Sequence, residues 1–182
     1  MKGPEDRVPV VTFEELAMPL FDQLYNFARW LTQDTADAED LVQETYSKAL
    51  RGFSSFRLGT NFRAWMYRIL RNSFLSSRTG LKTMVAIDEE TDDEDLLPAE
   101  NATPESILIE QANREMVQQV LVDLPVPFRE ILLLCEVGEM SYQEIAETLG
   151  IPLGTVMSRL SRARKALRVL LRQKRQGGGH GM

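Results

Sequence analysis

Apolar residues recur along most of this chain at intervals of three and four positions, which is the period of one face of an α-helix. The first two apolar faces run over about residues 20–31 and 36–50, and Gly52 follows the second. A third helix, after a polar loop, carries its apolar positions at Phe62, Trp65, Met66, Ile69, Leu70 and Phe74. No stretch shows the alternation of a β-strand, so the pattern predicts an all-α protein.

The distribution of charge divides this helical chain into parts. Although the net charge is −6, residues 51–86 hold seven basic residues and no acid, and residues 151–182 hold eight basic residues and no acid. Between these blocks, residues 87–110 hold ten acids and no basic residue. A segment so rich in charge and so poor in apolar residues cannot bury a core. The two separate basic blocks suit a protein that contacts DNA at two places.

The acidic segment separates two small helical domains. We expect an N-terminal domain over residues 13–80, an acidic flexible linker over residues 81–103, and a C-terminal domain over residues 104–175. Thr103-Pro104-Glu105 combines an N-cap residue, a proline at the first helical position and an acid in the first turn. This signature predicts a helix that ends near Asp123.

The C-terminal domain contains the pattern of a helix-turn-helix. Ser141 and Glu144 form a capping box, in which each side chain can bond the backbone N–H of the other residue at the start of a helix. Gly150 suits the left-handed residue that ends such a helix, and residues 151–154 form a tight turn. We expect the second helix to begin at Thr155. In DNA-binding proteins with this layout, the second helix lies in the major groove.

The second helix of this motif has an apolar face and a basic face. The apolar face carries Val156, Leu160, Ala163, Leu167 and Leu170. The other face carries Ser158, Arg159, Ser161, Arg162, Arg164, Lys165 and Arg168. A basic face alone is commonly a solvated helix surface. The capping box, the glycine turn and the lack of any acid after residue 147 together favour binding to duplex DNA.

A polar stripe lies opposite the apolar face of the second N-terminal helix, at Asp40, Gln43, Glu44 and Ser47. Asp40 and Glu44 are like charges four residues apart, an arrangement that destabilises a helix by roughly a few tenths of a kcal/mol. A cationic partner surface is one reason to retain this pair. A solvated helix face is the other interpretation.

Basic, aromatic and amide side chains mix in the third helix and in the loop before it. They are Phe56, Arg57, Arg63, Trp65, Tyr67, Arg68, Arg71 and Asn72. Aromatic rings beside arginines can stack on exposed bases, which is how single strands are held. For Phe62 and Trp65, a place in the core of the domain is the simpler interpretation.

Other features of the sequence disfavour several classes of protein. The single cysteine, Cys135, lies next to an apolar run, allows no internal disulfide and fits a reducing compartment as a structural thiol. The chain has no run of roughly 18 apolar residues and no signal-peptide pattern, so we expect a cytoplasmic protein without membrane insertion. It also lacks a phosphate-binding Gly-Lys loop, a metal-ligand cluster and a histidine beside a nucleophile. We therefore expect no cofactor, no metal and no enzymatic activity.

Three motifs occur in the order that is typical of one protein family. They are Asp37-Ala38-Glu39-Asp40-Leu41-Val42-Gln43-Glu44, Phe62-Arg63-Ala64-Trp65-Met66-Tyr67-Arg68-Ile69 and Gly154-Thr155-Val156-Met157-Ser158-Arg159-Leu160-Ser161-Arg162-Ala163-Arg164. The chain resembles the extracytoplasmic-function sigma factors of the sigma-70 family, which are subunits of bacterial RNA polymerase. The resemblance covers about residues 13–80 and 104–175 and implies a promoter-recognition subunit rather than an enzyme.

The resemblance also implies a role for each polar surface. The stripe would bind the polymerase core of β and β′ subunits, on the basic clamp helices of β′, through Asp40, Gln43, Glu44 and Lys48. The unpaired minus-ten element of promoter DNA would be held by Phe56, Arg57, Arg63, Tyr67, Arg68, Arg71 and Asn72. The duplex minus-thirty-five element would be read by Thr155, Met157, Ser158, Arg159, Ser161, Arg162 and Lys165. Strand opening then needs no nucleotide hydrolysis, because melted bases gain stacking and pocket contacts.

The resemblance says less about how the protein is regulated and about which promoter sequence it reads. Family members often have a basic residue at the position of Met157, so the minus-thirty-five sequence stays open. Members are commonly held inactive by an anti-sigma factor that masks both domains, and such a partner is implied here. In the family, the linker passes through the polymerase towards the active-centre and RNA-exit channels. A separate hypothesis is that the acidic linker covers the basic faces of the free protein.

Two other classes of function are alternatives. A conventional helix-turn-helix regulator would use its N-terminal domain to sense a ligand or to dimerise, and it would bind a palindromic site without stable polymerase association. Such a protein does not require the polar stripe or the basic and aromatic third helix. An enzyme acting on nucleic acid would need carboxylates or histidines in a basic setting, yet the two basic blocks contain no acid.

Overall fold

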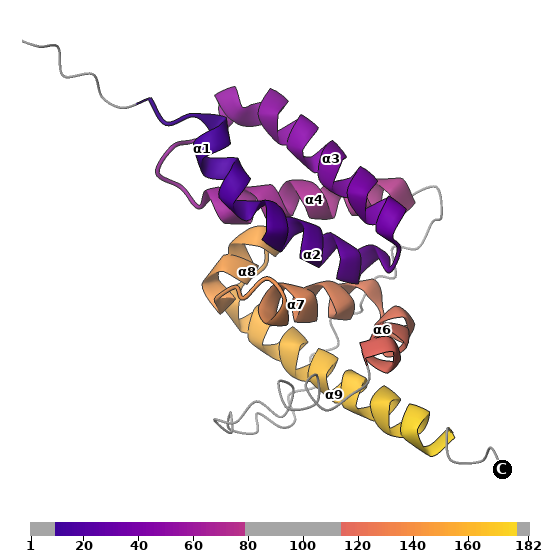
Figure 1. The fold of residues 1–182 in the computed structure, drawn as a ribbon. Coiled ribbons are helices and arrows are strands. Elements are labelled where there is room, and N and C mark those ends of the chain that lie inside the picture. The colour runs from indigo at the N-terminus through magenta and orange to yellow at the C-terminus, as the bar shows by residue number, and fades with distance from the viewer. Residues whose placement is uncertain (1–9, 79–113, 178–182) are drawn as a thin grey trace, which may run out of the picture.

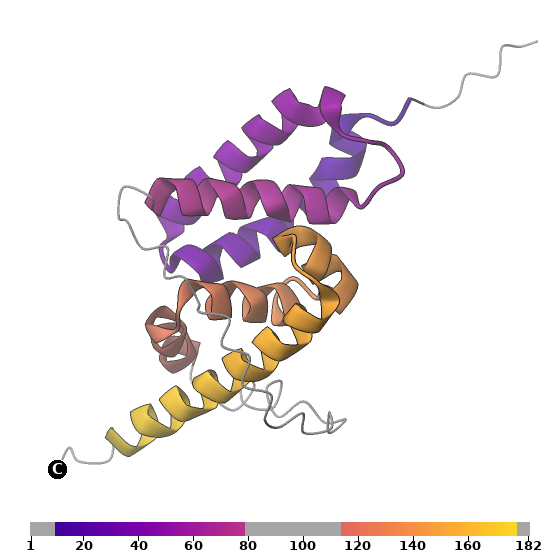
Figure 2. The ribbon, with the colours of Figure 1, turned by 180° about the vertical axis from the view of Figure 1, so that it is seen from behind.

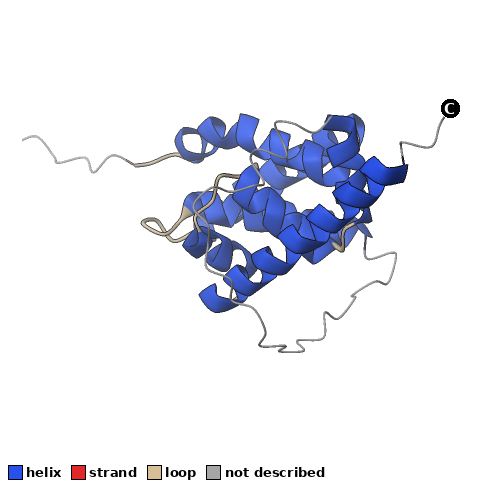
Figure 3. Cartoon of the chain, turned by 90° about the horizontal axis from the view of Figure 1, so that it is seen from below, coloured by secondary structure: helices blue, strands red, loops and turns tan. Residues whose placement is uncertain are grey.

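The computed structural model describes residues 10–78 and 114–177, and within these ranges it contains helices and no β-strand (Figures 1 and 3). The N-terminal domain consists of α1 (Phe13–Ala17), η1 (Met18–Leu20), α2 (Phe21–Thr32), α3 (Thr35–Gly52), η2 (Phe53–Ser55) and α4 (Phe62–Arg78). The C-terminal domain consists of α6 (Arg114–Asp123), α7 (Val126–Glu136), α8 (Tyr142–Leu149) and α9 (Leu153–Gly177). The all-α prediction is confirmed. The predicted linker, residues 81–103, and the helix start at Thr103-Pro104-Glu105 lie outside the described residues.

Helices α2, α3 and α4 pack around the apolar core of the N-terminal domain. Leu24, Phe27 and Leu31 of α2 are fully buried in this core, as are Met66 and Leu70 of α4. These positions follow the three-and-four spacing expected of one helix face. None of the helices within residues 10–78 and 114–177 combines the length and the apolar character needed to cross a bilayer.

A tight turn joins α2 to α3. Gln33 has a φ of 63°, the left-handed conformation that commonly ends a helix. Asp34 then caps α3, because its side chain accepts a hydrogen bond from the backbone N–H of Asp37 at 2.9 Å. The turn sets the register of α3 against α2 so that Leu41 and Val42 are buried and the polar stripe faces solvent.

Aromatic rings hold the loop between α3 and α4 in place. The ring of Phe56, in that loop, lies 4.9 Å from the ring of Trp65 and 5.2 Å from that of Phe62, between centroids. Phe53 and Phe13 pack edge-on against Phe62, and Phe53 also stacks on Phe56. Phe62 is buried as expected, whereas Trp65 is only partly buried and lies at the margin of the core. The loop is therefore fixed to the first turn of α4 by ring contacts and by the hydrogen bond from the Ala64 N–H to the Asn61 side chain.

Arg129 is a buried charge that closes the end of α6. Its side chain is 4% exposed. It donates to the carbonyl of Leu121 at 2.7 Å, and a second nitrogen donates to the carbonyls of Val122 at 2.8 Å and Leu124 at 3.3 Å. The last carbonyls of a helix have no partner within the helix. The guanidinium supplies these bonds and so stabilises the turn from α6 to α7.

The first helix of the helix-turn-helix forms as predicted. The backbone N–H of Ser141 donates to the Glu144 carboxylate at 3.0 Å, and the backbone N–H of Glu144 donates to the Ser141 hydroxyl at 3.2 Å. Gly150 has a φ of 66° and ends α8 in the left-handed conformation. The capping-box and glycine-turn predictions are both confirmed.

The second helix begins earlier than predicted. It starts at Leu153 rather than at Thr155. The Pro152 carbonyl already accepts a helical hydrogen bond from the Val156 N–H at 3.1 Å, so the chain turns into α9 directly after the proline. Gly154 therefore lies within the first turn of α9 and not in the connecting turn.

The two domains lie against each other (Figures 1 and 2). α2 contacts α7, and α4 contacts α8. α9 packs on α6, α7 and α8, and Figure 1 shows it on the side of the C-terminal domain away from the N-terminal domain. Helix α4 is therefore packed against its own domain on one side and against the C-terminal domain on another.

Replacing Arg129 with methionine should lower the free energy of unfolding by about 2–4 kcal/mol, because three carbonyls lose their donor and two of these hydrogen bonds are buried. Urea denaturation of the full chain measures this loss. Arg172→Met, at an exposed position of α9, is the matched control and should change stability by no more than about 0.5 kcal/mol. Equal effects of the two changes would contradict the capping role of Arg129.

Candidate nucleic-acid interface

The polar stripe of α3 is exposed and borders an apolar groove. Asp40, Gln43 and Glu44 are all exposed. The groove beside them has a volume of about 260 Å³ and is lined by Phe21, Tyr25, Glu39, Val42, Gln43 and Tyr46. Phe21 is 42% exposed, which is unusual for so large an apolar side chain. An exposed apolar patch with a rim of polar residues is typical of a protein-docking surface. The apolar half of this surface was not predicted from sequence.

Lys48, the basic member of the predicted polymerase-binding set, contacts its own domain. Its Nζ lies 2.5 Å from Glu44 Oε1 and donates to the hydroxyl of Ser73 at 3.0 Å. Ser73 belongs to α4 and is buried. Lys48 thus connects the stripe on α3 to α4 and orients the Glu44 carboxylate.

The predicted minus-ten residues lie on α4 and on the loop before it, and three of them, Phe56, Arg57 and Arg68, line a second groove. It has a volume of about 310 Å³ and is lined by Ser55, Phe56, Arg57, Thr60, Asn61, Ala64, Trp65, Arg68 and Glu147. Arg57 and Asn72 are exposed. Glu147 belongs to α8, so the C-terminal domain forms one wall of this groove.

Arg71 pairs with a carboxylate of the other domain. Its Nε lies 2.8 Å from Glu130 Oε2 and a terminal nitrogen lies 3.0 Å from Oε1, which is a bidentate ion pair. Glu130 is 3% exposed. Burial raises the pKa of the Glu130 carboxyl, and the pair with Arg71 and the charge of Arg159 offset only part of this rise. One buried carboxylate therefore interacts with a member of each predicted DNA-binding set.

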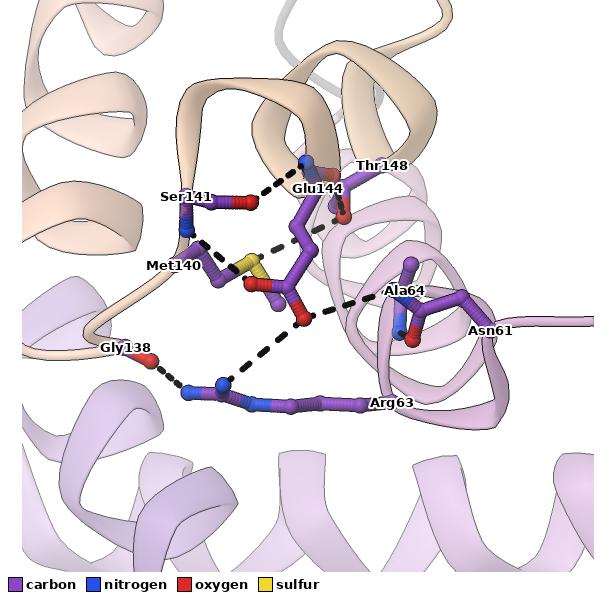
Figure 4. Close-up of polar contacts among 8 residues, drawn as sticks. All are labelled: Asn61, Arg63, Ala64, Gly138, Met140, Ser141, Glu144 and Thr148. Carbon is purple, nitrogen blue, oxygen red and sulfur yellow. Dashed lines mark hydrogen bonds and ion pairs between the residues drawn. The ribbon is translucent and has the colours of Figure 1, made fainter.

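Glu144 makes bonds on both sides of the domain boundary (Figure 4). One oxygen caps α8 through Ser141, while Oε1 accepts a hydrogen bond from the Asn61 side chain at 3.3 Å and lies 3.8 Å from an Arg63 nitrogen. Burial alone would raise the pKa of Glu144. The hydrogen bonds from Ser141 and Asn61 and the charge of Arg63 outweigh it, and the pKa lies below its ordinary value.

Two backbone carbonyls complete the contact between the domains. Arg63 donates to the carbonyl of Gly138, and Arg68 donates to that of Glu147 (the former is drawn in Figure 4). Gly138 is buried directly after α7, and a Cβ there would lie 2.7 Å from the Leu134 carbonyl oxygen. Only glycine fits this close approach. The chain can therefore turn so that the Gly138 carbonyl reaches Arg63.

Tyr67, predicted to contact minus-ten DNA, is fully buried. Its ring packs edge-on against Phe27, with 5.1 Å between centroids, and the Arg63 guanidinium lies 5.9 Å from the ring. Burial raises the pKa of its hydroxyl to about 12. With the domains together, Tyr67 is a packing residue, and its contact with DNA stays a prediction for a separated arrangement.

The predicted minus-thirty-five residues lie on the side of α9 that faces away from its buried positions. Val156, Leu160 and Ala163 are buried against the rest of the domain. Of the predicted set, Met157, Ser161, Arg162 and Lys165 are exposed, and Thr155, Ser158 and Arg159 are partly buried. The exposed members form a surface that a duplex can reach.

Arg164 does not share the outer basic face on which the sequence pattern placed it. A terminal nitrogen lies 3.4 Å from Glu136 Oε1 and 3.7 Å from the sulfur of Cys135, both on α7. Arg164 is the residue directly after the buried Ala163, so it lies at the boundary between the buried face and the outer face of α9. Arg164 therefore connects α9 to α7. Burial raises the pKa of the adjacent Cys135 thiol, which fits a structural role.

Comparison with known proteins assigns both domains. Residues 16–82 match sigma-70 region 2, and residues 114–167 match sigma-70 region 4. The extracytoplasmic-function RNA polymerase sigma factor SigE of Mycolicibacterium smegmatis is 38% identical over 165 residues, which cover 90% of this chain and 63% of SigE. The RNA polymerase sigma factor YlaC of Bacillus subtilis is 32% identical over 166 residues, which cover 91% of this chain and 95% of YlaC.

A solved structure gives the same assignment. The co-crystal structure of the sigma factor RpoE with the anti-sigma factor NepR from Bartonella quintana matches with a TM-score of 0.67 and 31% identity, over 88% of this chain and 96% of that one. Region 2 followed by region 4 defines a sigma-70-type protein. Within that class, this chain belongs to the extracytoplasmic-function family of RNA polymerase sigma factors.

The low pKa of Glu144 offers a test of the geometry between the domains. Arg63→Met should raise this pKa towards the ordinary value, because it removes a cation beside the carboxylate. Carboxyl carbon NMR shifts, followed through an acid titration of the full chain, give the value directly. Arg57→Met, at an exposed loop position, should leave it unchanged. The same Glu144 pKa in both variants would mean that Arg63 does not face Glu144.

Proposed function

We propose that this chain directs core RNA polymerase to a set of promoters and helps to open the DNA there. The observation that carries this proposal is the division of surfaces: an exposed acidic stripe lies on α3, while the arginines lie on α4 and α9. Such a chain can hold a basic protein surface and two stretches of DNA at once. By resemblance to the family, the acidic surface would bind polymerase and the basic surfaces would bind promoter DNA.

In this proposal α3 is the docking surface for polymerase. Asp40 and Glu44 supply negative charge, and the groove lined by Phe21 and Tyr25 supplies apolar contact. A basic helical surface on the partner would match both features, as the β′ clamp helices would by resemblance to the family. Charge complementarity of this kind sets partner choice and association rate more than affinity.

The loop before α4 and the exposed side of α4 would hold the minus-ten strand. Phe56 and Trp65 offer ring surface at the groove, and Arg57 and Arg68 border it. Stacking of an unpaired base on such rings is worth about 1–3 kcal/mol, which offsets part of the cost of unpairing. The chain would then act by binding alone and not as an enzyme.

The outer face of α9 would read the minus-thirty-five duplex from the major groove. Met157 and Ser161 lie early enough in the helix to reach base edges, whereas Arg162 and Lys165 can reach either bases or phosphates. The apolar Met157 would contact bases without a charge. It gives this chain a different recognition surface from relatives with a basic residue there.

We also propose that an anti-sigma factor holds this chain inactive. The RpoE structure that it resembles contains NepR, which is described as an anti-sigma factor. The same kind of partner, masking both domains, suits a chain of this family. Because its target is RNA polymerase, we place its action in the cytoplasm.

Purified full chain should form a complex with core RNA polymerase that initiates transcription, and Asp40→Arg combined with Glu44→Arg should abolish this complex. Reversing two exposed charges replaces attraction to a basic surface by repulsion without touching the core. Size-exclusion chromatography with core enzyme measures the complex. Glu14→Arg combined with Asp123→Arg, both exposed and outside the stripe, is the charge-matched control and should bind normally.

Normal binding of core polymerase by the stripe variant would refute the docking assignment. If the unchanged chain bound duplex DNA tightly and never associated with core, the conventional regulator would be the correct class. The two results are distinguishable, because the first concerns the variant and the second concerns the unchanged protein.

Arg162→Ala should weaken binding to minus-thirty-five duplexes, selected by the holoenzyme from a random library, by about 1–3 kcal/mol if Arg162 contacts a base. Fluorescence anisotropy measures this loss on the selected duplex and on a mixed-sequence duplex. An equal loss on both would assign Arg162 to the phosphates instead. Arg172→Ala, further along α9, is the control and should affect the selected sequence no more than the mixed one.

A further inference from the structure

The arginines of α4 that we assign to minus-ten DNA are bonded to the C-terminal domain. Arg63, Arg68 and Arg71 each have an acceptor oxygen from that domain, and Asn61 bonds Glu144. We propose that the free protein inhibits itself, because its C-terminal domain occupies these arginines and DNA must displace it. The proposal rests on the proposed function, since it assigns a closed state to the same DNA-binding residues.

The carboxylate of Glu130 occupies Arg71 as a phosphate would. A guanidinium pairs with a carboxylate or a phosphate through the same two parallel N–H donors. The distances of 2.8 and 3.0 Å show that both donors are used. A phosphate therefore cannot bind Arg71 in this way until Glu130 leaves.

The two other arginines lie at negative ends of helices. The carbonyl that accepts from Arg68 belongs to Glu147, in the last turn of α8, and the carbonyl that accepts from Arg63 belongs to Gly138, just past the end of α7. Unpaired carbonyls give a helix C-terminus a partial negative charge. The C-terminal domain thus presents carboxylate and carbonyl oxygens to a basic helix, where a nucleic-acid backbone would present phosphate oxygens.

The closed arrangement also restricts the groove that would receive a base. Glu147 forms a wall of the groove that contains Phe56 and Trp65. DNA and the C-terminal domain therefore compete for space as well as for charge. If only the open form of the protein binds DNA, the apparent dissociation constant equals that of the open form divided by the fraction of molecules that are open.

Glu130 is the residue at which to test closure, because it is buried at the boundary and belongs to neither predicted DNA-binding set. Glu130→Gln removes its charge with little change in shape. Glu136→Gln is the matched control: it is the same substitution on the same helix, and it weakens the ion pair to Arg164 within the C-terminal domain. Only the first change acts across the boundary.

Energy transfer between dyes at Glu14→Cys and Gln173→Cys, in a full chain carrying Cys135→Ser, reports the separation of the domains. Both labelling positions are exposed and lie on different domains. We expect Glu130→Gln to lower the transfer efficiency, because the domains separate, and Glu136→Gln to leave it unchanged. Circular dichroism of each variant verifies that the helices are retained.

A short fluorescein-labelled single-stranded DNA of mixed sequence is the binding probe. We expect Glu130→Gln to bind it about tenfold more tightly than the unchanged chain, as the open fraction rises. The charge swap Arg71→Glu with Glu130→Arg should restore the closed transfer efficiency that Glu130→Arg alone abolishes. This restoration separates an effect on closure from simple damage to α7.

Unchanged transfer efficiency in Glu130→Gln, or an equal change in Glu136→Gln, overturns the proposal. Opening without a gain in DNA affinity overturns self-inhibition as well. Neither measurement uses polymerase. A chain that fails to bind core enzyme, yet opens and gains DNA affinity in Glu130→Gln, would refute the proposed function and leave the closed state standing.

Discussion

Helix α4 belongs to two interfaces at once, and the rest of the structure depends on how both are satisfied. Met66 and Leu70 on one face are fully buried in the N-terminal core, while Arg63 and Arg71 bond the C-terminal domain. A helix has a fixed period, so burying the apolar face also fixes where the arginines point. The same orientation lets Ser73 receive Lys48 and thereby supports the polar stripe. The polar stripe, the groove before α4 and the domain contact are consequently all oriented by one helix.

The ionic contacts at the domain boundary respond to pH in opposite directions. The pKa of Glu144 is lowered, so its contribution to stability is present above the ordinary glutamate pKa and is lost as the pH falls through the lowered value. The pKa of Glu130 is raised by burial, so its contribution is full below the ordinary pKa and is lost as the pH rises through the raised value. Burial of ionised Glu130 has a desolvation cost that Arg71 only partly offsets, but the bond to Arg71 itself favours the ionised carboxylate, and Glu130→Gln removes that charge. Such a contact can be displaced by a competitor of moderate affinity.

Features that depend on neighbouring residues could be predicted from the sequence, whereas features that depend on contacts between distant residues could not. The capping box at Ser141 and the left-handed Gly150 depend on neighbours within a few residues, so residue type decides them. The start of α9 at Leu153 was missed because a proline carbonyl can begin a helix without any polar cap. Burial of Tyr67 and the pairing of Arg71 with Glu130 follow from tertiary contacts, and no periodicity contains them. The assignments of the remaining site residues to DNA and polymerase are still predictions.

The alternating charge blocks of the sequence have two physical consequences rather than one. A basic segment that attracts DNA also attracts acids of its own chain, and residues 111–150, which contribute Glu130 and Glu144, carry more acids than bases. The C-terminal domain offers these arginines a few fixed oxygens, whereas duplex DNA carries one negative charge per about 1.7 Å of its axis. The intramolecular contact has the advantage of proximity, and DNA has the advantage of charge density. In the proposed closed state, their balance decides whether this basic helix is covered by its own chain or binds DNA.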